Sequence, residues 1–204
     1  MNPKKINLKK KDFFNEKAEI WDEITVHDLE KVQYITEMLN IQGDDKILDV
    51  GTGTGIMIPF YERYLVKGSV VAIDYSEKMI EVARSKYPEK EHPKISYIVS
   101  DVYDLKYDSD FDIVVCYSCF PHLVDQTLAL KILSKALKKG GRLVIAHSDS
   151  AKTINRVHMN SGGEVGNDFL PSMKLLKQMM KESRLKVTFE RNDENYFICI
   201  ARKA

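Results

Sequence analysis

The chain has 204 residues, of which 44% are hydrophobic, so it can bury a core without disulfides or metal ions. No apolar run approaches the roughly 18 residues that cross a bilayer, and the first residues lack the apolar centre of a signal peptide, so we expect a cytoplasmic protein without membrane insertion. A formal net charge of +1 argues against nucleic acid as a partner, and three cysteines, an odd count, indicate reduced thiols.

The N-terminal part is first basic and then helical in pattern. Lysines are frequent from Lys4 to Lys11, which leaves two interpretations open: an arm that binds phosphate or nucleic acid, or a solvated and frayed terminus. From about Phe13 to Leu39, apolar residues recur at helical spacing, with an interruption around Thr25 to His27. We expect two helices in this segment.

From Lys46 onward, short apolar runs alternate with helical patterns. The runs KILDVG, SVVAIDYS, ISYIVSD, FDIVVCYSC and GRLVIAHS predict strands, and MIEVARSKY and LALKILSKALKK predict helices between them. This alternation is typical of a parallel sheet with helices on both faces. A long polar segment ends at Asp168, and SMKLLKQMMKESRL then predicts a helix before the strands KVTFERN and YFICIARK. Because only DEN separates these two strands, we expect the last strand to enter the sheet antiparallel.

Three glycines spaced two residues apart follow the first predicted strand, in the stretch ILDVGTGTGIMIPF. Gly51, Gly53 and Gly55 allow a tight turn and the close approach of a ligand, at the edge of the sheet where such folds bind ligands. Pro59 agrees with a helix that begins just after them, because proline is tolerated in a first helical turn. The alternative is a tight turn with a purely structural role.

The second predicted strand ends at Asp74, about 20 residues past the first glycine, where a carboxylate binds the ribose hydroxyls of a nucleotide-like cofactor. Capping of the following helix is the other explanation for this residue. The glycines alone do not choose between a dinucleotide and a nucleoside sulfonium cofactor. A dehydrogenase fingerprint, G-x-G-x-x-G, has its third glycine where this chain has Ile56, so the match to a dinucleotide fold is imperfect.

Five motifs occur in a fixed order and at suitable spacing: LDVGTGTG, AIDYSEKMIEVAR, SDVYDL, FDIVVCYSC and LKKGGRLVIAHS. Together they resemble the class I S-adenosylmethionine-dependent methyltransferases, in the small-molecule branch of type 11/25, over roughly Phe13 to Lys203. The resemblance implies an α/β fold with a Rossmann-like doubly wound sheet of seven strands, mostly parallel with the last strand antiparallel. It also implies S-adenosyl-L-methionine as cofactor and S-adenosyl-L-homocysteine as product.

The resemblance further implies which residues contact the cofactor and how the domain is divided. The implied contacts are Asp49, Gly51, Thr52, Gly53 and Gly55 at the methionine part, Asp74 at the ribose, Tyr75, Met79, Asp101 and Val102 at the adenine, and Cys116 and Tyr117 near the methyl group. Trp21 and the N-terminal helices would form a lid. We expect one methyltransferase domain over residues 1–204, with residues 1–42 as this lid and residues 149–170 as a substrate-side loop. The glycines of NSGGEVGND suit a mobile gate or a disordered connection.

Three of the five histidines follow the fourth or fifth predicted strand, on the ligand edge of the sheet. His122, His147 and His158 are our candidate catalytic residues, because an imidazole accepts a proton near neutral pH. One would act as general base and the others as acceptor contacts. Two alternatives stay open: a metal site shared with nearby cysteines or Asp168, and a purely structural role. The intervals match no compact metal-ligand motif, and we predict no metal.

The acceptor is constrained only by what the chain lacks. The segment CYSCFPHL, after the fourth strand, does not have the N-P-P-Y or D-P-P-Y pattern of amino-group methyltransferases. The opening FFNEKAEIWDEI resembles the quinone-biosynthesis branch, but the sequence shows no apolar approach surface for a membrane quinone. We therefore expect in-line methyl transfer to a small-molecule acceptor by a monomer or homodimer. A catalytically silent cofactor-binding protein and a nicotinamide-dependent oxidoreductase remain as alternatives.

Overall fold

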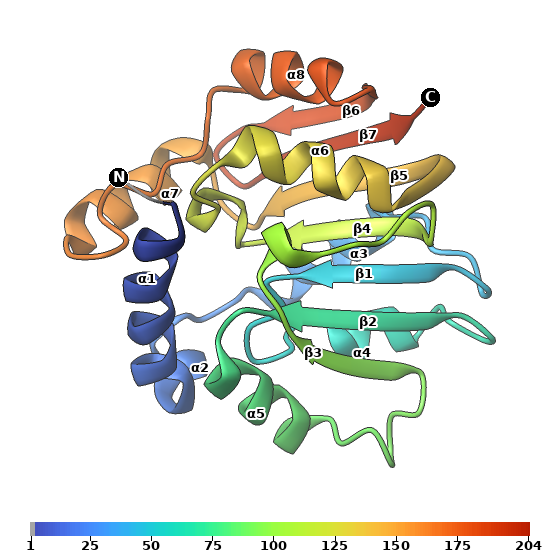
Figure 1. Ribbon diagram of the computed structural model, residues 1–204, viewed down its shortest axis with the longest axis horizontal. Coiled ribbons are helices and arrows are strands. Elements are labelled where there is room, and N and C mark those ends of the chain that lie inside the picture. The colour runs from blue at the N-terminus through green and yellow to red at the C-terminus, as the bar shows by residue number, and fades with distance from the viewer. Residues whose placement is uncertain (1–2) are drawn as a thin grey trace.

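One mixed sheet forms the centre of the molecule (Figure 1). The computed structural model describes residues 3–204, with side chains from Leu8 onward, and within that range the strand order is β3-β2-β1-β4-β5-β7-β6. The strands are β1 Lys46–Val50, β2 Ser69–Asp74, β3 Ile95–Val99, β4 Phe111–Tyr117, β5 Leu137–His147, β6 Leu185–Asn192 and β7 Phe197–Lys203. Strand β7 is antiparallel to both neighbours, and the other pairs are parallel. The predicted fold class and the antiparallel last strand are therefore confirmed.

The helices cover both faces of the sheet and its ligand edge. They are α1 Pro3–Lys17, α2 Trp21–Ile24, α3 Leu29–Met38, α4 Ile58–Glu62, α5 Glu77–Lys86, α6 Gln126–Ala136, α7 Ala151–Ser161 and α8 Met173–Glu182, with 3-10 turns η1 Ala18–Ile20, η2 Val102–Asp104 and η3 Phe120–His122. Most begin at a capping side chain: Ser76, Asp125 and Ser150, for example, accept hydrogen bonds from backbone N–H groups of the first turn. No helix in residues 3–204 combines the length and apolar character of a membrane span.

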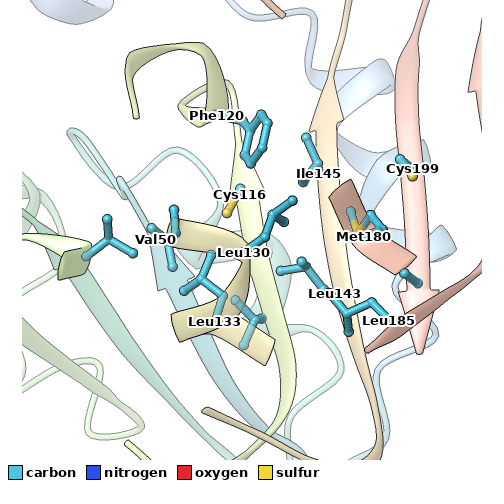
Figure 2. Close-up of a cluster of buried hydrophobic side chains, with 14 of the residues drawn as sticks. Val50, Cys116, Phe120, Leu130, Leu133, Leu143, Ile145, Met180, Leu185 and Cys199 are labelled. Carbon is cyan, nitrogen blue, oxygen red and sulfur yellow. The ribbon is translucent and has the colours of Figure 1, made fainter. Parts of the chain in front are cut away.

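Two apolar cores lie on opposite faces of the sheet. Side chains of α6 and α8 pack on one face, and those of α3, α4 and α5 pack on the other. In β1, Ile47 and Leu48 enter different cores, because successive side chains of a strand point to opposite faces. Figure 2 shows the first core, where Leu130 and Leu133 of α6 face the strands that carry Val50 and Cys116. Strands buried on both faces explain the continuous apolar runs in the sequence.

The structure differs from the sequence predictions in three places, each near the ligand edge or a strand end. Helix α1 begins at Pro3, so the lysine-rich segment is helical and not an irregular arm. The segment 149–170, expected as a loop, contains α7, which the side chain of Ser150 caps. Strand β5 begins at Leu137, opposite Phe111, and shortens the predicted helix before it.

The carboxyl ends of the parallel strands meet at one edge, where α1 and α7 lie (Figure 1). The sheet order places β1 between β2 and β4, so the chain leaves β1 toward one side first and reaches the other side later. Folds of this kind bind ligands in the crevice at that point, beyond the strand ends.

Candidate functional site

A cavity of about 470 Å³ lies at this edge, which is a common size for small-molecule sites. Its walls come from the loops after β1, β2, β3, β4 and β5, and from the N-terminal helices and α7. Two groups of polar side chains face it. We call Asp49 and Asp74 with the glycine turn Gly51–Gly55 the carboxylate cluster. We call His122, His147 and His158, together with Asp168 outside the lining, the histidine cluster.

The glycines of the turn have different tasks. Gly51 has φ +64°, and a Cβ there would lie 2.6 Å from Cβ of Cys119. Gly53 has φ +56°, lines the cavity, and would place a Cβ in open space. Gly55 does not line the cavity, because it faces Ile58 and Tyr87. Only part of the turn therefore offers its backbone to a ligand, whereas Gly55 serves the packing of the turn.

Asp74, at the end of β2, is held against the glycine turn. Its carboxylate accepts hydrogen bonds from the backbone N–H of Gly53 at 3.0 Å and of Ser76 at 2.9 Å. Burial raises the pKa of Asp74 to about 6, although these backbone hydrogen bonds act in the opposite direction. The carboxylate can accept further hydrogen bonds, because each oxygen has two lone pairs.

Asp49 lies deeper, in the centre of the sheet, with Ala72 of β2 and Val115 of β4 as its register partners. Its oxygens accept hydrogen bonds from the hydroxyl of Thr52 at 2.7 Å and of Tyr61 at 3.0 Å. Burial is the main reason that the pKa of Asp49 rises to about 6, and the nearby charge of Asp74 adds to it. Two desolvated carboxylates beside one cavity favour a ligand that brings positive charge or hydrogen-bond donors.

An aromatic wall adjoins the carboxylate cluster. Phe14 of α1 packs against Trp21, with ring centroids 5.4 Å apart, and against Tyr75, at 5.9 Å. Met79 and Val165 are buried in the same group. The hydroxyl of Tyr75 is buried and has no hydrogen-bond partner in the described residues, so a ligand is its natural partner.

Helix α2 closes over the glycine turn. Asp22 accepts a hydrogen bond from the hydroxyl of Thr54 at 2.5 Å and forms an ion pair with Lys86 of α5 at 2.6 Å. Trp21, Ile24 and Thr25 line the cavity from this side. Sequence reasoning named Trp21 but missed Phe14 and Asp22, although FFNEKAEIWDEI has the spacing of a helix with one apolar face.

The end of β4 contributes Tyr117 and Ser118 but not Cys116. The hydroxyl of Tyr117 lies 2.9 Å from Nδ1 of His27 and donates to Oγ of Ser148 at 3.1 Å. Cys116 points into the core against α6, as Figure 2 shows, and the cavity lining does not include it. Its expected cofactor contact is corrected accordingly, because neighbouring side chains of a strand alternate between faces.

The remaining residues expected at the cofactor lie around the cavity. Thr52, Tyr75, Met79, Asp101, Val102 and Trp21 all line it. Asp101 also accepts a hydrogen bond from the backbone N–H of Tyr103 at 3.2 Å. The only expected contacts outside the lining are Gly55 and Cys116.

The three candidate histidines all line the same cavity. The rings of His122 and His158 are 4.8 Å apart between centroids. His147 is buried at the end of β5, and its Nε2 has no hydrogen-bond partner in the described residues. Burial lowers the pKa of His147 to about 3, and burial also lowers that of His158, so both imidazoles are neutral near pH 7.

Asp168 holds this cluster together. Its carboxylate accepts from Nδ1 of His122 at 2.8 Å and pairs with Nζ of Lys10 in α1. Its backbone oxygen accepts from Nδ1 of His158. Sequence reasoning considered Asp168 only as a metal ligand, and no group of three His, Cys, Asp or Glu side chains in residues 3–204 is arranged to hold a metal ion.

The site fits the cofactor implied by the resemblance. S-adenosylmethionine carries an ammonium group, ribose hydroxyls and an adenine amino group, all of which are hydrogen-bond donors. The cavity offers the carboxylates of Asp49, Asp74 and Asp101 as acceptors, open backbone at Gly53 and an apolar aromatic wall. The unpartnered hydroxyl of Tyr75 adds one more polar group to this part of the cavity.

Comparison with known proteins points the same way. The family described as "Methyltransferase domain" matches residues 48–145. The chain is 28% identical over 138 residues to the ubiquinone/menaquinone biosynthesis C-methyltransferase UbiE of Idiomarina loihiensis, covering 65% of this chain and 55% of that one. It is 30% identical over 112 residues to the demethylmenaquinone methyltransferase of Thermotoga maritima, covering 54% and 47%. The chain spans about half the length of the curated relatives it matches.

A solved structure shows the same fold over the full length of both chains. The SAM-dependent methyltransferase of Aquifex aeolicus superposes with a TM-score of 0.70 at 18% identity, and the match covers 100% of each chain. The motif order, the family match and the sheet with its antiparallel β7 agree with one another. The central part of the chain thus matches a methyltransferase domain, and its sequence and fold are similar to those of S-adenosylmethionine-dependent methyltransferases.

Proposed function

We propose that this chain transfers a methyl group from S-adenosylmethionine to a small-molecule acceptor. The observation that carries the proposal is the single cavity onto which both the carboxylate cluster and the histidine cluster open. The first cluster suits the cofactor, and the second suits an acceptor that must lose a proton. Relatives whose names refer to quinone biosynthesis support an acceptor of low molecular weight.

The carboxylate cluster would bind the cofactor through charge and shape. Asp74 would accept hydrogen bonds from the ribose hydroxyls, and Asp49, which Thr52 and Tyr61 orient, would face the cationic methionine part. The other proposed contacts are Gly51, Thr52 and Gly53 at the methionine part, Tyr75, Met79, Asp101 and Val102 around the adenine, and Tyr117 and Trp21 near the methyl group and the lid.

When bound, S-adenosylmethionine supplies a methyl group on a positively charged sulfur, which an acceptor atom attacks in line. The protein then has three tasks: alignment of the acceptor, exclusion of water and removal of a proton. The aromatic wall and α2 would exclude water. His122 is the proposed base, because Asp168 orients its Nδ1 and its Nε2 makes no hydrogen bond within the described residues. His147, neutral and unpartnered, would instead hydrogen-bond to the acceptor.

The lining favours an uncharged acceptor. Apart from the three aspartates and the histidines, the side chains that face the cavity are uncharged. Ile24 and Val157 line the cavity and are 55% and 52% exposed, so they form an apolar part of its rim. This rim supports a second candidate, an acceptor with an apolar substituent, as in the quinone pathways that the relatives' names mention.

Calorimetric titration with S-adenosylmethionine, S-adenosylhomocysteine and NADH tests the cofactor first. We expect both sulfur compounds to bind and NADH not to bind; NADH binding alone would indicate an oxidoreductase. Purified protein is then incubated with S-adenosylmethionine and small phenols, hydroquinones and amines, and release of S-adenosylhomocysteine is measured. Cofactor binding without release for any acceptor would indicate a catalytically silent protein.

A further inference from the structure

Asp168 connects three parts of the chain that are far apart in sequence. It lies between α7 and α8 and is only 5% exposed. Through its carboxylate it contacts Lys10 of α1 and His122 of η3, and through its backbone oxygen it contacts His158 of α7. No motif in the sequence marks this residue, and the cofactor contacts do not require it.

The two hydrogen bonds to histidines fix which ring nitrogen carries the proton. An ionised carboxylate and a backbone carbonyl only accept hydrogen bonds, so Nδ1 of His122 and Nδ1 of His158 are the donors. In a neutral imidazole the other nitrogen, Nε2, then keeps its lone pair. Both rings line the cavity, so Asp168 prepares two proton acceptors at the proposed acceptor site.

Lys10 makes this arrangement dependent on α1. Lys10 and Phe14 are four residues apart, so they lie on one face of α1, and both are buried, as is Ala18 at the start of η1. A buried ammonium group is stable only when it is paired. Asp168 provides the opposite charge. Val165, which lies in the same segment between α7 and α8 (residues 162–170), packs with Phe14 and Ala18.

Hydrogen bonds connect the C-terminal end of the segment 162–170 to α6 and α7. The side chain of Asn155 donates to the backbone oxygen of Leu170 at 3.1 Å and accepts from its N–H at 2.8 Å. Gln126 of α6 donates to the backbone oxygen of Phe169 at 3.0 Å. Asp168 thus lies next to residues that are hydrogen-bonded to α6 and α7. Helix α1 contacts Asp168 through Lys10.

We propose that Asp168 is a positioning residue that couples the docking of α1 to the alignment of His122 and His158. With α1 docked, Lys10 pairs with the carboxylate, and the carboxylate in turn holds Nδ1 of His122 and orients its ring. With α1 undocked, the carboxylate would lose its pairing with Lys10 and would no longer hold Nδ1 of His122 in one orientation. The proposal rests on the proposed methyl transfer and adds that the base is competent only under a closed lid.

The titratable and charged groups around His122 come from four elements. They are Lys10 of α1, His147 of β5, His158 of α7 and Asp168 of the segment 162–170. Of these, only Lys10 lies on the element whose docking is proposed to change. Its removal therefore isolates the contribution of the lid.

The first test uses ¹⁵N NMR of the imidazole nitrogens in cofactor-free protein. The variants are Asp168→Asn, Lys10→Met and, as matched control, Lys11→Met, which removes the neighbouring exposed ion pair to Glu77. We expect the parent and Lys11→Met to show His122 and His158 with a proton on Nδ1 only. Lys10→Met and Asp168→Asn should each change the Nδ1 signal of His122, because both weaken the contact that orients its imidazole. Parental signals in both variants would overturn the proposal.

The second test follows the lid. Trp21 is the only tryptophan, so its fluorescence reports S-adenosylhomocysteine binding, and hydrogen exchange reports the docking of α1. We expect Lys10→Met to bind about tenfold more weakly and to lose protection in α1, while Lys11→Met behaves as the parent. Because Lys10 and Asp168 act together, the double variant should lose little more than one single variant.

Parental affinity and protection in Lys10→Met would also overturn the proposal, and this variant decides the question if Asp168→Asn does not fold. The NMR readout is recorded without cofactor, so the inference and the proposed function can fail separately. A parent that binds no S-adenosylhomocysteine would overturn the proposed function, whatever the imidazole signals show.

Discussion

The two clusters that face the cavity are built in different ways. In the carboxylate cluster, Asp74 accepts hydrogen bonds from Ser76, two residues away, and from Gly53 in the loop after the neighbouring strand β1. Asp49 accepts one from Thr52, three residues away. In the histidine cluster, Asp168 pairs with Lys10 of α1, which is 158 residues away in sequence. The first cluster forms with the central strands. The second joins side chains of η3, β5, α7 and the segment 162–170, and α1 contacts it through Lys10.

The clusters also differ in the charge that they favour. Burial raises the pKa of Asp49 and Asp74 to about 6, so their ionised forms are costly until a cation or donor arrives. Burial lowers the pKa of His147 to about 3, so this part of the cavity resists gaining positive charge. One cavity thus combines a region suited to a cationic ligand with a region suited to an uncharged one.

The largest expected effect is on the carboxylate cluster. Gly53→Val should abolish binding of S-adenosylhomocysteine, with a loss of about a thousandfold or more, because the added side chain fills cavity space in front of the turn. Gly140→Val is the matched control: Gly140 also has a positive φ, of +76°, and open space around it, but lies outside the cavity. Both variants should carry similar backbone strain, of about 1–3 kcal/mol.

Calorimetry measures the affinity, and circular dichroism checks the fold of both variants. If Gly53→Val bound like the parent, the glycines would serve the turn alone. If Gly140→Val lost binding as well, backbone strain and not cavity space would be responsible.

This difference in construction explains what the sequence could predict. The residues of the carboxylate cluster follow strands directly, and the strands are readable as apolar runs, so Asp49, Gly53 and Asp74 were identified and do line the cavity. Of the two neighbours expected at the cofactor, Tyr117 lines the cavity and Cys116 points into the core, because side chains alternate between the faces of β4 and the motif does not mark which face each takes. Gly55 belongs to the same motif but serves packing.

The histidine cluster could be predicted only in part. His122 follows β4 in the sequence and His147 ends β5, and this was enough to place both at the ligand edge of the sheet. The ion pair between Lys10 and Asp168 was missed, because the sequence carries no signal that joins two segments so far apart. A lysine on the apolar face of α1, four residues before Phe14, was the one local sign of a buried partner.

The next largest effect should fall on the histidine cluster and on turnover. Of His122→Ala, His147→Ala and His158→Ala, we expect His122→Ala to lower turnover by about 10²–10⁴, the usual cost of removing a general base. His92→Ala is the control, since His92 pairs with Glu62 outside the cavity. Turnover is measured with an acceptor from the panel, together with cofactor affinity and melting temperature. Near-parental turnover in all three cavity variants would remove the histidines from the reaction.

A smaller loss is expected when one carboxylate is removed. Asp74→Ala should weaken S-adenosylmethionine and S-adenosylhomocysteine alike, by about ten- to a hundredfold, because a hydrogen bond to a charged group contributes roughly 1.5–3 kcal/mol. Asp112→Ala removes an aspartate that pairs with Lys138 at the opposite end of β4, and it should bind as the parent does. Unchanged affinity in folded Asp74→Ala would exclude Asp74 from the cofactor site.

The smallest effect separates the two clusters by pH. The pKa of His147 is about 3 in the folded protein and near 6.5 when unfolded, so its stabilising contribution is present above pH 6.5 and is lost as the pH falls toward 3. Asp49 and Asp74 act in the opposite direction: their pKa rises from 3.8 to about 6 on folding, so their contribution is present below pH 4 and is lost as the pH rises through 6. Between pH 8 and pH 5, His147 alone should lower the free energy of unfolding by about 2 kcal/mol.

His147→Phe and His147→Asn both remove this titration but differ in packing and hydrogen bonding. We therefore expect the two variants to differ in stability by a constant amount and to share the same pH dependence. Between pH 8 and pH 5, the free energy of unfolding of each variant should change by about 2 kcal/mol in the stabilising direction relative to the change in the parent. Urea unfolding at several pH values, without cofactor, provides the measurement. If the parent and both variants lost stability in parallel on acidification, His147 would not be held neutral by burial, and the contrast in charge between the two clusters would disappear. Neither variant has a titrating side chain at position 147. If the pH dependence of the free energy of unfolding changed in only one of them, the effect would be due to packing at the end of β5.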